Sequence, residues 1–331
     1  MKYQITIIGL GQIGASVGLA LGEHPDLLYR VGHDLEIKVA RQAEKMGALD
    51  KVSVNLPSAV QDADIVLLSL PLDQIRDTMA VIADDLKEGA VVMDTAPVKE
   101  VVANWAAELL PEKRHYIGLT PVINPAYLHT HESGVEAAHA DLFKDGLIAI
   151  VAPPRTASEA VKLAADLTRL LGSTPLFADP IEIDSLMSAT HILPQLLAAA
   201  LLNITVDQPG WYEGRKLAGR AYAEMTGPVV QMGEAAGLCS AAIHARESML
   251  RVTDSLIAAL QAIRSDIDKE SYQTLVERVE RARSDRGRWW SQRLAANWTA
   301  EEMPSTRAPE SSSAFGRLFG LGRRPKEDKN Q

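Results

Sequence analysis

Cysteine and positive charge are both scarce in this chain of 331 residues. The single cysteine, Cys239, excludes a framework of internal disulfides and is typical of a protein from a reducing compartment, so we expect a cytoplasmic location. The 34 lysine and arginine residues are outnumbered by 43 acidic residues, and the formal net charge of -9 argues against a nucleic-acid partner.

Long apolar runs are scarce too. We find no run of about 18 uncharged apolar residues, which predicts that no segment spans a membrane. The chain enters its first expected strand close to Met1, so we expect no signal peptide. The remaining composition, 47% hydrophobic and 23% charged, is typical of a soluble globular protein, and the length allows two domains with a core each.

A glycine-rich turn at residues 9–14, Gly-Leu-Gly-Gln-Ile-Gly, is the most informative motif. It follows an apolar run and precedes a stretch of small residues with helical character, which is the setting of a dinucleotide-binding turn. Gly9 allows the tight turn, Gly11 lets the backbone approach a pyrophosphate, and Gly14 lets the helix pack close to the strand. The turn therefore predicts a nucleotide site at the start of the first helix.

An acidic residue completes this motif. A second apolar strand ends in Asp34, 20 residues beyond Gly14, where a carboxylate can accept a hydrogen bond from a ribose 2′-hydroxyl. Leu35 and Glu36 follow, with no arginine to pair with a 2′-phosphate, so NAD is favoured over NADP. The alternative is that Asp34 only caps a helix that begins near Ile37.

Short apolar runs alternate with helical patterns through the first half of the chain and predict an α/β fold, a Rossmann-type doubly wound parallel sheet. Ligands bind at the carboxyl ends of such strands, which places Leu70 and Pro71 in the same crevice as the glycine turn. The expected strands are residues 5–8, 28–31, 65–69, 90–93, 115–118, 148–151 and 175–177.

Helical periodicity replaces the strands from about Ile181 onward. We expect a long apolar helix at 184–203, interrupted by Pro194, and amphipathic segments at 227–236, 241–265 and 269–296. The apolar surface of these helices leads us to expect a homodimer. The expected domains are a dinucleotide-binding domain at 1–178, a helical substrate and dimerisation domain at 179–298, and a disordered tail at 299–331.

An ordered set of motifs resembles the prephenate and arogenate dehydrogenases of tyrosine biosynthesis. The set comprises the glycine turn with residues 32–34, residues 63–66 with Leu70 and Pro71, residues 94–99, residues 133–138 with 141–143, and residues 191–195. The resemblance implies an NAD-dependent enzyme with a small carboxylate substrate: a cyclohexadienol loses its hydroxyl proton, passes hydride to NAD, and loses carbon dioxide as the ring becomes aromatic. The expected cofactor residues are Gly9, Leu10, Gly11, Gln12, Ile13, Gly14, Asp34, Leu70, Pro71 and Thr95.

Two positions depart from the pattern of this family. Pro97 stands where the family has a serine that contacts the substrate, and Thr120 stands where it has the histidine that accepts the hydroxyl proton. A threonine hydroxyl can orient a group but cannot store a proton near neutral pH. The loop at 122–132 is about five residues longer than usual, and one of its polar side chains could replace the imidazole, or all could be solvated. These side chains are Asn124, Tyr127, His129 and His131.

In the second half, His191 lies one position early relative to the family's helix histidine when the two are aligned on Pro194. One residue rotates a side chain by about 100° on a helix, so His191 either faces the crevice or packs in the core. Lys216 matches the family's substrate-binding arginine best by position, with Arg215 and Arg220 nearby, unless all three form a solvated face. The spacing of histidines, cysteine and acids offers no metal site, and we expect none.

Three functions therefore stay open. The first is a dehydrogenase of this family that acts on prephenate, arogenate or a close relative. The second is a dehydrogenase of the same fold whose pocket, altered at Pro97 and Thr120, accepts a different small carboxylate. The third is a protein that binds NAD without catalysis.

Overall fold

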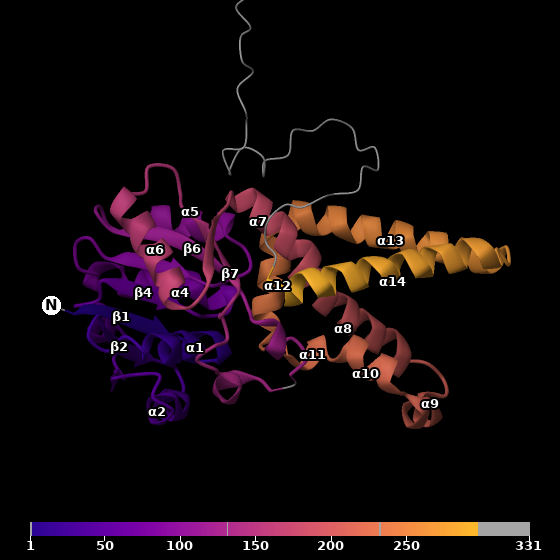
Figure 1. Cartoon of the computed structure of the whole chain (residues 1–331), viewed down its shortest axis with the longest axis horizontal. Helices are drawn as coiled ribbons and strands as arrows, with labels where there is room; N and C mark the ends of the chain where they lie inside the picture. Colours follow the sequence, from indigo (N-terminus) through magenta and orange to yellow (C-terminus); the bar gives the residue numbers. More distant parts are fainter. Residues whose placement is uncertain (1, 131, 232, 297–331) are drawn as a thin grey trace, which may run out of the picture.

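The computed structural model describes residues 2–130, 132–231 and 233–296. A sheet flanked by helices forms one part of the molecule and a bundle of helices forms the other, and the two lie side by side (Figure 1). The predicted tail at 299–331 and the loop histidine His131 lie outside the described residues.

The sheet has eight strands in the order β3-β2-β1-β4-β5-β6-β7-β8. The order reverses beside β1, the switch point at which doubly wound sheets bind ligands. The strands are β1 (Tyr3–Ile8), β2 (Leu28–His33), β3 (Lys51–Val52), β4 (Ile65–Leu68), β5 (Val91–Asp94), β6 (His115–Val122), β7 (Leu147–Val151) and β8 (Thr174–Phe177).

The predicted doubly wound α/β fold is confirmed, with two differences. The strand β7 runs antiparallel to β6, whereas the sequence predicted a wholly parallel sheet. The described residues between these strands form only short 3-10 turns, η2 (Pro125–Tyr127) and η3 (Gly134–Ala137), and an antiparallel pair needs no crossover helix. The strand β3 was missed because two residues carry no periodicity.

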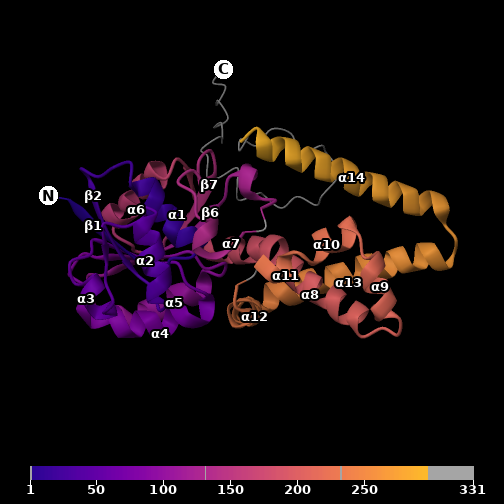
Figure 2. The same ribbon diagram turned by 90° about the horizontal axis from the view of Figure 1, so that it is seen from below.

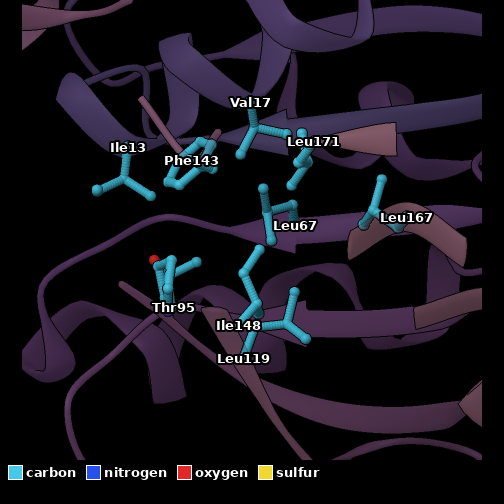
Figure 3. Close-up of a pocket in the computed structure, with 10 residues that line it drawn as sticks. Ile13, Val17, Leu67, Thr95, Leu119, Phe143, Ile148, Leu167 and Leu171 are labelled. Atoms are coloured by element: carbon cyan, nitrogen blue, oxygen red, sulfur yellow. The ribbon is translucent and has the colours of Figure 1, made fainter. Parts of the chain in front are cut away.

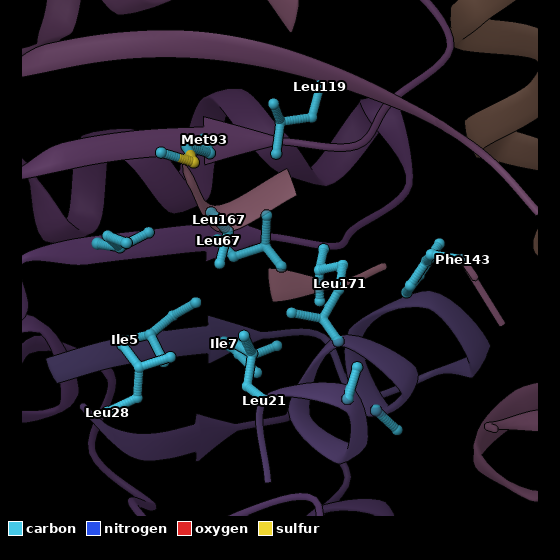
Figure 4. Packing of buried hydrophobic residues seen from close by; sticks show 14 of the residues in the cluster. Ile5, Ile7, Leu21, Leu28, Leu67, Met93, Leu119, Phe143, Leu167 and Leu171 are labelled. Atoms are coloured by element: carbon cyan, nitrogen blue, oxygen red, sulfur yellow. The ribbon is translucent and has the colours of Figure 1, made fainter. Parts of the chain in front are cut away.

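Apolar side chains cover both faces of the sheet, which explains the continuous apolar runs of the strands. Ile5, Ile7, Leu67 and Phe143 pack on the face that α1 covers (Figure 4). Ile8, Val66 and Leu68 point to the other face, where α4 packs. The helices of this part are α1 (Gln12–Leu21), α2 (Ile37–Lys45), α3 (Leu56–Val60), α4 (Leu72–Ile82), α5 (Glu100–Leu109) and α6 (Ser158–Leu170), with a short 3-10 turn η1 (Ala83–Asp85) after α4.

The second part is helical in all its regular elements. The predicted helix at 227–236 is interrupted, because Gly233 adopts a positive φ of 68° between α11 and α12. The predicted boundary after residue 178 lies between β8 and α7. The elements are α7 (Pro180–Met187), the π-helical turn η4 (Ser188–Ile192), α8 (Leu193–Val206), α9 (Trp211–Leu217), α10 (Arg220–Thr226), α11 (Pro228–Gln231), α12 (Ala235–His244), α13 (Arg246–Asp268) and α14 (Tyr272–Leu294).

The last two helices form a hairpin that extends away from the sheet (Figure 1). Figure 2 shows α14 running back from the far end of this hairpin toward the sheet. There Arg293 donates a hydrogen bond to the carbonyl oxygen of Ile123, and the rings of Trp290 and His129 lie 5.1 Å apart. The end of α14 therefore holds the loop that follows β6.

One helical segment among the described residues, Pro180–Val206, is long and apolar enough to cross a membrane by length and composition. The stretch has no charged side chain from Ser185 to Val206, and polar residues such as Ser188 and Gln195 interrupt its apolar run. The expectation that no segment spans a membrane stays a prediction. Only 11% of its apolar window is buried within one chain. The segment also supplies His191 and Gln195 to a cavity between the two parts of the molecule.

Candidate active site

A cavity of about 820 Å³ lies at the carboxyl ends of β4, β5 and β6. The glycine turn forms one wall, and the helical part, through η4 and α12, forms the opposite wall. The loop after β6 contributes a third wall that includes Tyr127, Leu128 and Glu132. This volume is in the range of cofactor and substrate sites, and both parts of the molecule line the pocket, as is typical of an active site.

A second, much smaller void lies behind this pocket (Figure 3). Its volume is about 10 Å³, and Val17, Leu67 and Phe143 are among the apolar side chains that line it. Ile13 and Thr95 line both spaces. A void of this size holds about one water at most, so it belongs to the packing of α1 on the sheet and not to a ligand site.

The glycine turn has the geometry that its sequence predicted. Gly9 has a φ of 87°, and a Cβ atom on it would overlap the carbonyl oxygen of Ser69. A Cβ atom on Gly14 would overlap the carbonyl oxygen of Gly9, so α1 packs on the turn without room for a side chain. A Cβ atom on Gly11 would meet nothing within 4 Å, which leaves open space over the first turn of α1. That space suits a pyrophosphate, because the unpaired N–H groups of a helix start attract anions.

Asp34 is tied to this turn. Its Oδ2 accepts a hydrogen bond from the backbone N–H of Leu10 at 2.8 Å, and its Oδ1 accepts one from the N–H of Glu36 at 2.9 Å. The helix α2 has no side-chain cap, so the alternative that Asp34 caps this helix is not what the structure shows. A carboxylate has about four acceptor positions, which leaves lone pairs for a ribose hydroxyl.

The predicted cofactor residues fall into two groups. Gly11, Gln12, Ile13, Leu70, Pro71 and Thr95 line the pocket. Gly9, Leu10 and Gly14 support the turn from behind, and Asp34 lies beside it at the end of β2. The structure thus brings these residues together around the start of α1, and their contacts with a cofactor stay a prediction.

Thr120 lies on β6 and lines the pocket. Thr120 is only 4% exposed. Its Oγ1 atom has no hydrogen-bond partner among the described residues. A buried hydroxyl without a partner costs about 1–3 kcal/mol. Pro97 lines the same pocket at the end of the β5 turn and offers no donor. Thr120 therefore brings a hydroxyl without a protein partner to the pocket wall, and its contact with a ligand stays a prediction.

His191 also lines the pocket, which decides between the two orientations that the sequence left open. It lies in the π-helical turn η4, and Met187 and Gln195 flank it on the same wall. A π-helical turn accommodates one extra residue, which offsets the shift of one position that the sequence shows. Solvent in the pocket reaches the ring, yet surrounding protein lowers the pKa of His191 by desolvation and favours the neutral imidazole.

The sequence offered four polar side chains in the loop after β6 as replacements for the missing imidazole. Among the described residues, one of these four lines the pocket. Tyr127 lines the pocket but donates its hydroxyl to Asp141 at 2.5 Å, which raises its pKa to about 12 and leaves it unsuited to accept a proton. Asn124 accepts from the N–H of Ala126, and His129 contacts Trp290. Of the described imidazoles, His191 is the one that lines this pocket.

The three predicted substrate cations lie elsewhere. Lys216 pairs with Glu213 at 2.7 Å, and Arg220 pairs with Glu224 at 2.7 Å. Arg215 stacks on the ring of Tyr212, on the helix α9 at the far end of the helical part (Figure 1). Within one chain the structure does not bring them to Thr120 and His191, so their substrate role stays a prediction.

A buried polar cluster beneath the pocket was missed by sequence reasoning. The Lys99 Nζ donates to Asp94 Oδ1 at 2.7 Å, and the Tyr116 hydroxyl donates to Asp94 Oδ2 at 2.6 Å. Burial lowers the pKa of Lys99 and raises that of Tyr116. The backbone N–H of Ala96 also donates to Asp94, so the cluster fixes the turn that carries Thr95 and Pro97.

Asp184 joins the helical part to this cluster. Its carboxylate accepts hydrogen bonds from the backbone N–H groups of Lys99, at 2.5 Å, and Glu100, at 3.1 Å. It therefore caps the start of α5 from the neighbouring domain, and burial raises its pKa. The sequence signal was an acid at the start of an apolar helix, which gave no indication of its distant partners.

Replacing Asp184 by alanine is expected to lower the free energy of unfolding by about 2 kcal/mol, because two backbone donors lose their acceptor. Thermal and urea unfolding of the purified variant would measure the loss. Asp166→Asn is the matched control, since Asp166 pairs with Arg169 on an exposed helix face. An equal stability of Asp184→Ala and wild type would contradict the capping role.

Residues 17–174 match the family model described as prephenate dehydrogenase, nucleotide-binding domain. Over these residues the chain is similar to the nucleotide-binding domain of the prephenate dehydrogenases. The resemblance predicted from the motifs is thereby confirmed, and with it the prediction of an NAD-dependent dehydrogenase that resembles prephenate dehydrogenase.

Two curated bacterial enzymes are similar to this chain. It is 24% identical to the prephenate dehydrogenase of Bacillus subtilis over 288 residues, which are 86% of this chain and 76% of that protein. It is 28% identical to the cyclohexadienyl dehydrogenase of Zymomonas mobilis over 203 residues, which are 60% of this chain and 66% of that protein.

Solved structures show the same fold. The prephenate dehydrogenase from A. aeolicus in complex with hydroxyphenyl propionate and NAD+ superposes with a TM-score of 0.76 at 19% identity, covering 87% of this chain and 98% of that one. The Synechocystis arogenate dehydrogenase superposes with a TM-score of 0.67 at 21% identity, covering 86% of this chain and 99% of that one. Both parts of this dehydrogenase therefore follow the family fold.

Proposed function

We propose that this dehydrogenase uses NAD to oxidise and decarboxylate a cyclohexadienyl carboxylic acid, converting prephenate to 4-hydroxyphenylpyruvate or arogenate to tyrosine. The observation that carries the proposal is a single pocket lined by the glycine turn, by Thr120 of β6 and by His191 of the helical part. A substrate there lies between a nucleotide-binding turn and two side chains that can bond to its hydroxyl.

The residues around the start of α1 fit a dinucleotide. Gly11 leaves the approach open, and the helix start supplies N–H groups for the pyrophosphate. Asp34 keeps lone pairs for a ribose hydroxyl, and the exposed Leu35 and Glu36 offer no cation for a 2′-phosphate, which favours NAD over NADP. When bound, NAD accepts a hydride from the substrate carbon.

His191 and Thr120 have different roles at the substrate hydroxyl. Thr120 donates to or accepts from this hydroxyl and orients it, since Oγ1 has no partner among the described residues. The neutral imidazole of His191 accepts the hydroxyl proton as the carbon gives up its hydride. Carbon dioxide then leaves, the ring becomes aromatic, and the imidazolium returns its proton to the phenol oxygen.

The direct test is to incubate the purified protein with NAD and either prephenate or arogenate, and to follow NADH by absorbance and the product by chromatography. NADH and product formed in equal amounts from at least one acid would support the proposal. No turnover of either acid, with NAD or NADP, would overturn it. NAD-linked turnover of another small carboxylate alone would favour the altered-pocket alternative, for which the observations are Pro97 and Thr120 in the pocket wall.

We further propose that the protein is a cytoplasmic homodimer that pairs through its helical part. Large apolar side chains are exposed along this part, and a second copy would bury them. Support for the location is the single cysteine and the biosynthetic character of the relatives. The exposed apolar residues include Ile204 on α8, Leu250, Ile257, Leu260 and Ile267 on α13, and Val279 on α14.

Light scattering of the purified protein is expected to give about twice the chain mass of 35.9 kDa. Ile257→Glu with Leu260→Glu is expected to shift the mass toward one chain, because both side chains are half-exposed on α13. Val81→Glu, at an exposed position on α4, is the matched control and keeps the dimer mass. A monomeric wild type at all concentrations would contradict the pairing.

A further inference from the structure

The charged side chains that line the active-site pocket, among the described residues, are all acidic. Glu132 and Glu234 contribute carboxylates, whereas no lysine or arginine appears among the described residues that line it. Desolvation favours the neutral form of His191, the remaining titratable nitrogen in the wall. The charged side chains in the wall of one chain's pocket therefore favour a cationic group beside Glu132 or Glu234.

The two carboxylates differ in their surroundings. Glu234 accepts a hydrogen bond from the Gln74 side chain at 3.4 Å and lies at the start of α12. Glu132, on the loop after β6, has no hydrogen bond or ion pair with any described residue. Glu132 is thus the carboxylate whose acceptor positions remain available to a ligand.

A second observation shows that this part of the molecule is built for a polar ligand. Thr120 is only 4% exposed, lines the same pocket, and its Oγ1 has no partner among the described residues. Buried hydroxyls are nearly always bonded, so the pocket has a polar group that can bond to a ligand. Glu132 therefore borders a ligand site and is not merely a solvated surface acid.

The two substrates of the proposed function differ at one group. Prephenate carries a keto group in its side chain, and arogenate carries an ammonium group at that carbon. Both have two carboxylates, so the keto acid has a charge of about -2 and the amino acid a charge of about -1 at neutral pH. The ammonium can pair with a carboxylate in the wall, whereas the keto acid only meets like charge.

We infer that Glu132 receives the ammonium group of an amino-acid substrate and makes this dehydrogenase prefer arogenate to prephenate. This inference rests on the proposed function, because it chooses between the two acids of that reaction. Glu132 acts as a specificity-determining residue: it binds the side chain of the substrate and takes no part in the transfer of hydride or proton.

The experiment compares kcat/KM for the two acids in wild type and in three variants. Wild type is expected to favour arogenate. Glu132→Gln is expected to lower the arogenate-to-prephenate ratio about tenfold, mainly by raising KM for arogenate, because the amide keeps the size but loses the charge. Glu132→Asp keeps the charge and is expected to retain part of the preference. Glu136→Gln is the matched control, since Glu136 bonds to Gln42 outside the pocket lining and its loss leaves the ratio unchanged.

A wild type that favours prephenate, or an unchanged ratio in Glu132→Gln with an unchanged melting temperature, would overturn the inference and leave the proposed function standing. Turnover of neither acid would instead overturn the proposed function. Calorimetric titration with the two products tests the inference without turnover. Tyrosine is expected to bind about tenfold more weakly to Glu132→Gln than to wild type, and 4-hydroxyphenylpyruvate equally or more tightly.

Discussion

Gly14→Ala is expected to weaken NAD binding by about a hundredfold and to lower the melting temperature. The added Cβ atom overlaps the carbonyl oxygen of Gly9, which belongs to the backbone and cannot rotate away. The start of α1 must then move off the turn, and overpacking of this kind costs about 1–3 kcal/mol. Fluorescence or calorimetric titration with NAD measures the affinity, and thermal unfolding measures the stability.

Two further glycine variants sharpen this test. Gly11→Ala is expected to leave the melting temperature unchanged but to weaken NAD binding, because its Cβ atom enters space that is open only until the cofactor occupies it. Gly287→Ala is the control, because a Cβ atom at this position on α14 also meets nothing within 4 Å. This variant is expected to keep the NAD affinity of wild type. Wild-type NAD affinity in both Gly14→Ala and Gly11→Ala would show that this turn is not the cofactor site.

His191→Ala is expected to reduce kcat by about two to four powers of ten, which is the usual contribution of a general base. NAD affinity is expected to stay unchanged, because His191 lies on the wall opposite the glycine turn. Steady-state kinetics with the preferred acid, together with a separate NAD titration, distinguishes the two effects. A variant with normal kcat would remove His191 from the mechanism.

The pH profile tests the same role independently. Activity is lost when a base becomes protonated, and desolvation by the surrounding protein lowers the pKa of His191 from its ordinary value of 6.5. The acid limb of kcat/KM is therefore expected below pH 6.5, and it should be absent from the residual activity of His191→Gln. His129→Gln is the control, because this histidine contacts Trp290 and does not line the pocket.

Local features of the fold and the cofactor turn were predictable from sequence. The strands of the sheet core appear as apolar runs because both faces are covered, and Gly9, Gly14 and Asp34 have roles that depend on their near neighbours. These features are set within one strand–turn–helix unit. Periodicity and turn chemistry report on such units directly.

The substrate side of the pocket was not predictable in the same way. The orientation of His191 depends on a π-helical turn, and the pattern of apolar residues in the sequence does not predict such a turn. The cluster of Lys99, Asp94 and Tyr116 joins residues up to 22 positions apart. The distance of Lys216 from the pocket depends on how the helices pack, which similarity in motif order does not determine.

The bonds from Lys99 and Glu100 to Asp184 also bear on how the chain folds. These partners are 85 and 84 positions apart, so the start of α5 gains its acceptor only after the chain has passed the end of β8. A fragment that stops at residue 178 would leave two donors and the buried Lys99 without this carboxylate. The cooperative folding unit is therefore larger than the nucleotide-binding unit, and the helical part takes part in completing the sheet domain.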